Sequence, residues 1–140
     1  MPERLREVMT PDPVTVAATA SLQHAAELMR DRDIGDVLVV DESGALFGIV
    51  TDRDIVVAGI AEGLDPASTS VDKVCTQDPI SLGPDDAVAQ AVKLMSDRAI
   101  RRLPVVDNGI IVGIVSLGDL AIDRDPDSVL GEISEAPPNN

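Results

Sequence analysis

The chain has 140 residues, of which 44% are hydrophobic, one is a cysteine and one a histidine, and its formal net charge at pH 7 is −14. This charge argues against a nucleic-acid partner, and a single aromatic residue, Phe47, provides no platform for stacking bases. The lone cysteine and histidine leave no intramolecular disulfide or zinc cluster, and no apolar run approaches the ~20 residues of a membrane span, so we expect a soluble, cytoplasmic protein without metal or membrane partner.

The first half of the chain predicts a β-α-β-β-α unit. Residues 14–16 form a short apolar strand, and a helix is predicted from Ser21 to about Arg32 because apolar residues recur at helical spacing. Strands at 37–40 and 46–50 flank a tight turn, and a second helix is predicted to begin at Asp52.

The second half predicts the same elements in the same order. They are a strand at 80–82, a helix at 87–98, strands at 103–106 and 110–115, and a helix from Leu117. The pair Asn108-Gly109 predicts a hairpin turn between the last two strands, since these residues readily take positive φ.

Three shorter apolar segments have helical spacing. They are Leu5/Val8/Met9, Val71/Val74/Cys75 and Leu130/Ile133, and each predicts one or two helical turns packed on a sheet. We therefore read Cys75 as a core residue rather than a reactive thiol, and His24 as an ordinary helix residue rather than a catalytic base. The last residues, 135–140, are expected to be disordered.

The two halves are a tandem repeat. Residues 8–42 and 44–56 align with 74–108 and 109–121, and 18 of the 48 aligned pairs are identical. Chance does not give this agreement. The predicted boundaries are 4–62 for the first domain, 63–70 for a connector, 71–134 for the second domain and 135–140 for the tail.

One motif occurs in both repeats, as Gly48-Ile49-Val50-Thr51-Asp52-Arg53-Asp54 and as Gly113-Ile114-Val115-Ser116-Leu117-Gly118-Asp119. Each copy is read as a buried strand that runs into a helix, because Thr51 or Ser116 is a good N-cap and an acid follows three residues later. Such a helix start can hold a phosphate with its unpaired N–H groups. The spacing is also nearly that of a capping box, so a purely structural role stays open.

The repeated unit and its motif resemble the cystathionine β-synthase (CBS) domain, and two copies resemble a CBS pair, or Bateman module. Blocks such as Asp33-Ile34-Gly35 and Gly63-Leu64-Asp65-Pro66 are similar to stand-alone bacterial CBS pairs of the hypoxic response protein type. The resemblance implies an α/β (α+β) fold with tandem β-α-β-β-α repeats packed with pseudo-two-fold symmetry. It also implies a regulatory protein associated with stress.

The resemblance further implies an adenosine-containing ligand, such as AMP, ADP, ATP or S-adenosylmethionine, in clefts between the two units. Asp54 and Asp119 would accept the ribose hydroxyls, while Thr51 and Ser116 would meet the phosphate. The other residues implied at the adenine are those at the start of each second strand (Ile34, Gly35, Asp36, Ile100, Arg101, Arg102) and those of the opposite wall (Thr10, Val14, Thr76, Ile80).

The two implied sites differ in charge. Residues 8–56 hold three Arg against nine Asp/Glu, a balance of −6, whereas residues 74–122 hold four Lys/Arg against six Asp, a balance of −2. Arg101 and Arg102 replace Gly35 and Asp36, so the second site should accept a phosphorylated ligand more readily. Arg53 is a cation in the first site only, and a solvated strand edge remains an alternative reading of the arginine pair.

Two functions of different classes follow. One is a nucleotide sensor that signals by a conformational shift, and the other is a ligand-free dimeric scaffold or interaction module. No nucleophile and base can be placed together, so an enzyme is not expected and no cofactor is required. A homodimer is expected through helices whose faces carry small residues: Ala25, Ala26, Ala58, Ala89 and Ala91.

Overall fold

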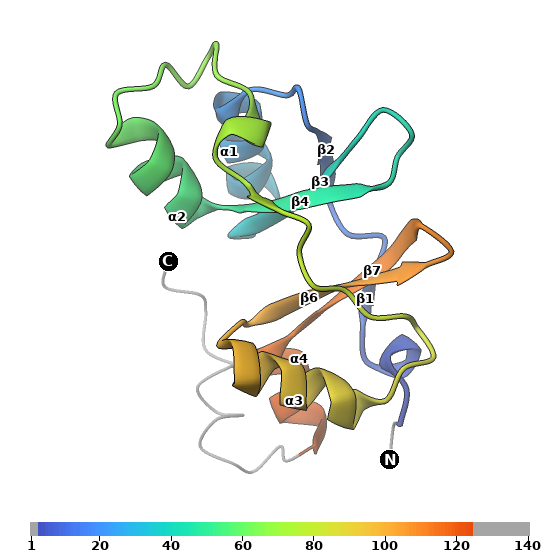
Figure 1. Cartoon of the computed structure of the whole chain (residues 1–140). Helices are drawn as coiled ribbons and strands as arrows, with labels where there is room; N and C mark the ends of the chain where they lie inside the picture. Colours follow the sequence, from blue (N-terminus) through green and yellow to red (C-terminus); the bar gives the residue numbers. More distant parts are fainter. Residues whose placement is uncertain (1–2, 125–140) are drawn as a thin grey trace. The chain divides into compact units, whose positions relative to one another are not determined.

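The computed structural model describes residues 3–124 and the side chains of residues 3–120. The mixed α/β class is confirmed, and the predicted elements occur in the predicted order except for the strand at 80–82 (Figure 1). The helical elements are η1 (Leu5–Glu7), α1 (Leu22–Arg32), α2 (Asp52–Asp54), η2 (Ile55–Ile60), η3 (Val71–Lys73), α3 (Val88–Arg98) and α4 (Leu117–Arg124). The strands are β1 (Thr10–Pro11), β2 (Thr15–Ala17), β3 (Asp36–Val40), β4 (Leu46–Thr51), β5 (Thr76–Gln77), β6 (Arg102–Asp107) and β7 (Ile110–Ser116).

Membrane-spanning length is not reached by any of the described helices. The helical turn predicted around Leu130 and the tail 135–140 lie outside the described residues.

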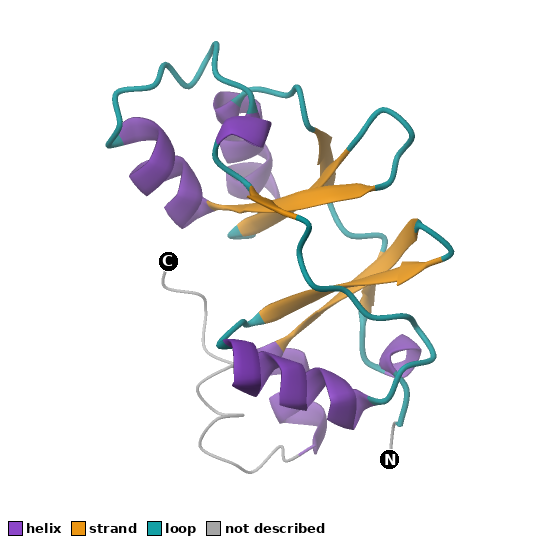
Figure 2. Ribbon diagram, in the orientation of Figure 1, coloured by secondary structure: helices purple, strands orange, loops and turns teal. Residues whose placement is uncertain are grey.

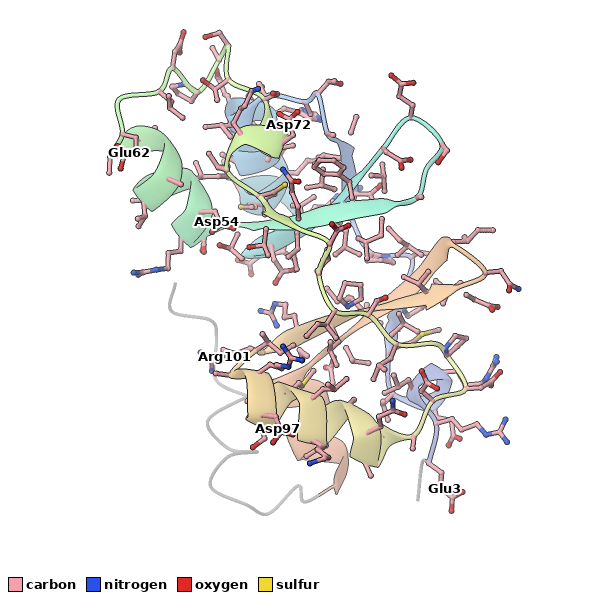
Figure 3. The ribbon with its side chains drawn as sticks, viewed as in Figure 1. Glu3, Asp54, Glu62, Asp72, Asp97 and Arg101 are labelled. Carbon is pink, nitrogen blue, oxygen red and sulfur yellow. The ribbon has the colours of Figure 1, made fainter. Side chains whose placement is uncertain are left out.

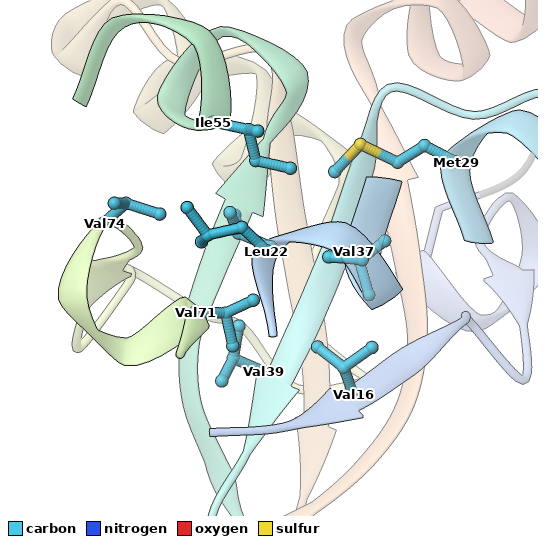
Figure 4. Close-up of a cluster of buried hydrophobic side chains, with 10 residues drawn as sticks. Val16, Leu22, Met29, Val37, Val39, Ile55, Val71 and Val74 are labelled. Carbon is cyan, nitrogen blue, oxygen red and sulfur yellow. The ribbon is translucent and has the colours of Figure 1, made fainter. Parts of the chain in front are cut away.

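One packing unit is formed by Val14–Pro79. Its four-stranded sheet has the order β2-β3-β4-β5, with β2 parallel to β3 and the other neighbours antiparallel. Helix α1 packs Leu22 and Met29 against Val37 and Val39 of the sheet (Figure 4). The buried side chains of this unit are Val16, Leu22, Ala25, Met29, Val37, Val39, Val50, Ile55, Val71 and Val74.

The other packing unit combines, among the described residues, 3–13 with 80–124. Its sheet has the order β1-β7-β6, and both strand pairs are antiparallel. The strands and the helices α3 and α4 enclose a second core, which contains Leu5, Val88, Ala91, Met95, Leu103, Val105, Val115 and Leu120. Figure 2 shows the strands of this unit in orange and its helices in purple.

The leading segment of each half, residues 5–11 or 71–77, packs with the other half of the sequence. Strand β5 pairs with β4, and β1 pairs with β7, so the short leading helices η3 and η1 each enter the core next to these pairings. Val71 and Leu5 are fully buried there. The packing units therefore differ from the predicted domain boundaries, which follow the sequence repeat and keep each leading segment with its own half.

The predicted strand at 80–82 is wrong except for one bridge, between Leu82 and Val105. In the first repeat the N–H of Leu38 donates to the carbonyl of Val14 at 3.1 Å, which helps to hold β2 against β3. Pro104 occupies the position of Leu38 in the second repeat and has no N–H to donate. The loss of this donor explains why the counterpart of β2 in the second repeat is reduced to this one bridge.

The helix predicted from Asp52 is confirmed, and after one turn it continues as the π-helical segment η2. The N–H of Ala61 donates to the carbonyl of Val56 at 2.8 Å, five residues back. The predicted hairpin at Asn108-Gly109 is also confirmed, with φ of 51° and 81° at the two residues.

Candidate functional site

Each candidate site begins where a sheet strand passes into a helix, at β4 and α2 or at β7 and α4. The Asp54 N–H donates to Thr51 Oγ1 at 3.1 Å, and the Thr51 N–H donates to Asp54 Oδ2 at 2.9 Å. The second motif repeats this exchange between Ser116 and Asp119, at 3.0 and 3.1 Å. The capping-box interpretation is therefore confirmed in both motifs.

The cap engages only one oxygen of each motif carboxylate. Within the described residues, Oδ1 of Asp54 and Oδ1 of Asp119 have no hydrogen-bond partner. Both side chains are half-buried, and Figure 3 marks Asp54 at the start of α2. An ionised carboxylate oxygen held in this position can accept hydrogen bonds from the hydroxyls of a ligand while the helix cap stays intact.

The start of the neighbouring strand lies beside each motif. In the first unit the Asp52 N–H donates to the Gly35 carbonyl at 3.0 Å, and Asp36 lies opposite Thr51 in the sheet. These contacts bring the predicted segment 34–36 next to the motif in this packing unit.

The second unit has the same arrangement with other side chains. The Leu117 N–H donates to the Arg101 carbonyl at 2.7 Å, and Arg102 lies opposite Ser116. Arg101 (labelled in Figure 3), Arg102 and Arg53 of the first unit are exposed, and Ile34 and Ile100 are half-buried against the two cores.

The predicted wall residues divide between the two units. Thr76 lies opposite Ile49 of the first motif, and Val14 packs against the same core. Thr10 lies opposite Ile114 of the second motif, and Ile80 packs in that unit. The sequence alone names these residues but does not assign each of them to a motif. No local pattern indicates that the leading segment of each half packs with the other half.

Cys75 lies half-buried against the core of the first unit, as its reading as a core residue predicts. Burial raises the pKa of its thiol, and the carboxylates of Asp72 and Asp54 add to this rise. The thiolate that a reactive cysteine needs is therefore disfavoured. His24 is exposed on α1, which agrees with its reading as an ordinary helix residue.

Sequence reasoning missed an exposed apolar surface on η2. Val56, Val57 and Ile60 have exposed fractions of 58%, 48% and 51%. The alanines expected at a dimer contact are less suited to that role than η2, since Ala25 and Ala91 are fully buried in the cores of their own units. The sequence did contain a signal for this surface. Residues 55–57 and Ile60 are all apolar, and a helix cannot turn all of these positions toward one core.

Comparisons with known proteins agree with the resemblance drawn from the motifs. The model of the CBS domain matches residues 5–60 and 71–122. The CBS domain-containing protein YhcV of Bacillus subtilis (strain 168) is 40% identical over 120 residues, which cover 86% of this chain and 84% of YhcV.

Solved structures of similar chains carry different ligands. The structure of Hypoxic Response Protein I with two coordinated zinc ions has 30% identity and a TM-score of 0.78, covering 84% of this chain and 96% of that one. The CBS domain pair of protein MJ0100, in complex with 5′-methylthioadenosine and S-adenosyl-L-methionine, has 27% identity and a TM-score of 0.78, covering 89% and 98%. Over the described residues of this chain, no group of three or more His, Cys, Asp or Glu is arranged to hold a metal ion.

Proposed function

Because the chain belongs to the CBS domain family and carries two copies in tandem, we propose that this regulatory module binds an adenosine-containing ligand and signals by a conformational shift. The observation that carries the proposal is the unengaged oxygen of each half-buried motif aspartate, next to the start of the neighbouring strand. We assign no reaction to the module, since the family model that matches both repeats is that of the CBS domain and not that of an enzyme.

The described residues include groups suited to each part of an adenosine, which supports the proposal. Asp54 or Asp119 accepts hydrogen bonds from the two ribose hydroxyls, which are adjacent donors. The aliphatic side chains of Val14 and Ile34 at the first motif, or of Ile80 and Ile100 at the second, pack on the base, and strand-start backbone groups bind its edge. The complex of MJ0100 with two adenosine compounds supports this assignment by similarity. Ligand binding then favours the conformation with higher affinity, and a partner reads the change in population.

A thermal-shift screen of AMP, ADP, ATP and S-adenosylmethionine tests the proposal. A ligand that binds only the folded chain, present at 100 times its dissociation constant, adds about 2.7 kcal/mol to the free energy of unfolding. GMP serves as the control, because it keeps the ribose and phosphate and changes only the base. No shift with any adenosine compound at millimolar concentration would contradict the proposal.

The exposed apolar residues of η2 favour a second candidate function, a homodimeric scaffold in a stress response. Val56, Val57 and Ile60 would be covered by a second copy of the chain. Sedimentation analysis at micromolar concentration should show a dimer that Ile60→Asp converts to monomer. Ile110→Asp, the same change at another exposed isoleucine (65% exposed, against 51% for Ile60), should leave the dimer intact. A wild-type monomer would exclude the dimeric scaffold and leave the sensor proposal untouched.

A further inference from the structure

The two motifs differ in how their first helical N–H groups are satisfied. In the first motif the Arg53 N–H donates to Oδ1 of Asp52 at 2.8 Å, the Asp52 N–H donates to Gly35, and the Asp54 N–H donates to Thr51. All three N–H groups at the start of α2 are thus engaged by the chain itself.

The second motif has Leu117 in place of Asp52 and Gly118 in place of Arg53. The N–H groups of Leu117 and Asp119 are engaged as in the first motif, by Arg101 and Ser116. The Gly118 N–H has no partner among the described residues, because no carboxylate side chain stands where Asp52 stands in the first motif. A ligand oxygen can therefore be bound by this N–H without displacing a group of the protein.

The charges around the motifs also make the second motif the better place for an anion. The first motif and the strand start beside it contain Asp36, Asp52 and Asp54 and one arginine, Arg53. The second motif and its strand start contain Arg101 and Arg102 and one aspartate, Asp119. A phosphate group near Asp52 would meet a like charge and would also have to compete with this carboxylate for the Arg53 N–H.

We infer that Asp52 is a specificity-determining residue that excludes phosphate from the first motif. The first motif then takes an adenosine compound without a 5′-phosphate, such as a thioether or sulfonium nucleoside, and the second motif takes a 5′-phosphorylated one. This inference rests on the proposed function and adds a separate ligand class for each motif. The inference depends on the contact between Asp52 Oδ1 and the Arg53 N–H, and not on the arginine pair of the other repeat.

Calorimetric titration with AMP and with 5′-methylthioadenosine tests the inference in the full chain. In an Asp119→Asn background, which leaves the first motif intact, Asp52→Asn should raise the affinity for AMP roughly tenfold and change that for 5′-methylthioadenosine less than about twofold. The matched control is Glu42→Gln, which removes one negative charge from an exposed turn of the same packing unit and should leave both affinities unchanged.

The reciprocal change tests the second motif in an Asp54→Asn background. Leu117→Asp should weaken AMP binding about tenfold relative to Leu117→Asn, which has the same size and loses the same core contacts but carries no charge. Equal affinity for AMP in these two variants, or an Asp52→Asn change that affects both compounds alike, would overturn the inference alone. If neither compound bound the wild-type chain, the proposed function would fail together with it.

Discussion

At the scale of single residues, the motif aspartates combine a structural and a proposed binding role. Asp54 and Asp119 use Oδ2 to accept the N–H of the N-cap residue, and Oδ1, which has no partner among the described residues, is the atom proposed to meet a ligand. The spacing of the motif predicted both a cap and a site, and the geometry is compatible with both. What the spacing could not indicate is that Asp52 also engages an N–H group of the same helix start.

Gly48 is needed for the close approach of β5 to β4. A Cβ at this position would lie 2.5 Å from the Thr76 carbonyl oxygen and 2.9 Å from Cys75 Sγ. Since backbone cannot give way cheaply, Gly48→Ala should lower the free energy of unfolding by about 1–3 kcal/mol, measured by urea denaturation. At the corresponding residue of the second repeat, Gly113, a Cβ would lie 2.5 Å from Met9 Sδ and 2.9 Å from the Thr10 carbonyl oxygen.

Gly83→Ala is the control for this prediction. The nearest atom to a Cβ there is Asp86 Oδ2 at 3.6 Å, an ordinary contact, and the φ of Gly83 is not in the left-handed region. This variant should be as stable as the wild type or slightly more stable, because alanine restricts the unfolded chain. Equal effects of Gly48→Ala and Gly83→Ala would show that the approach of β5 is not the reason for the glycine.

At the scale of elements, the apolar pattern predicted α1, α3, β3, β4, β6 and β7 because each buries a face with a regular period. It missed β1 and β5, which are two residues long and pair with distant strands. A strand is predicted at 80–82 because this segment repeats 14–16, but Pro104 on the neighbouring strand has no N–H to donate, and only one bridge forms.

The starts of α1 and α3 allow a paired test of helix capping. Ser21 Oγ accepts the N–H of His24 at 3.0 Å, whereas Ala87 has nearly the same backbone angles and no side-chain cap. Ser21→Ala should lower the free energy of unfolding by about 1 kcal/mol, and Ala87→Ser should raise it by about 0.5–1 kcal/mol. Chemical denaturation measures both. A loss of stability in Ala87→Ser would contradict this account of the two helices.

At the scale of the whole molecule, each packing unit contains parts of both repeats. Val71, Val74 and Leu5 lie in cores formed mainly by the other half of the sequence. A repeat read from the sequence gives the order of the elements, but local patterns do not indicate which sheet a leading segment joins. The tandem fold could therefore be predicted, while the grouping of Thr76 with the first motif could not.

Two fragments of equal length separate the packing units from the sequence repeat. Residues 14–79 contain the complete first core, whereas residues 1–66 lack Val71 and Val74 and therefore leave that core open. We expect the 14–79 fragment to show helical circular dichroism and a cooperative thermal transition, and the 1–66 fragment to show neither. Cooperative folding of 1–66 alone would contradict the exchange of leading segments.

The central claim, that the motif aspartates bind the ribose of an adenosine ligand, is tested most directly by titration calorimetry. The wild type, Asp54→Asn, Asp119→Asn and the double variant are titrated with the adenosine compound that gives the largest thermal shift. Asparagine keeps the capping oxygen, so each single change should cost no more than about 1 kcal/mol of stability. The account predicts a ten- to hundredfold loss of affinity, about 1.5–3 kcal/mol, at the altered motif and no measurable binding in the double variant. Unchanged affinity in the double variant would contradict it.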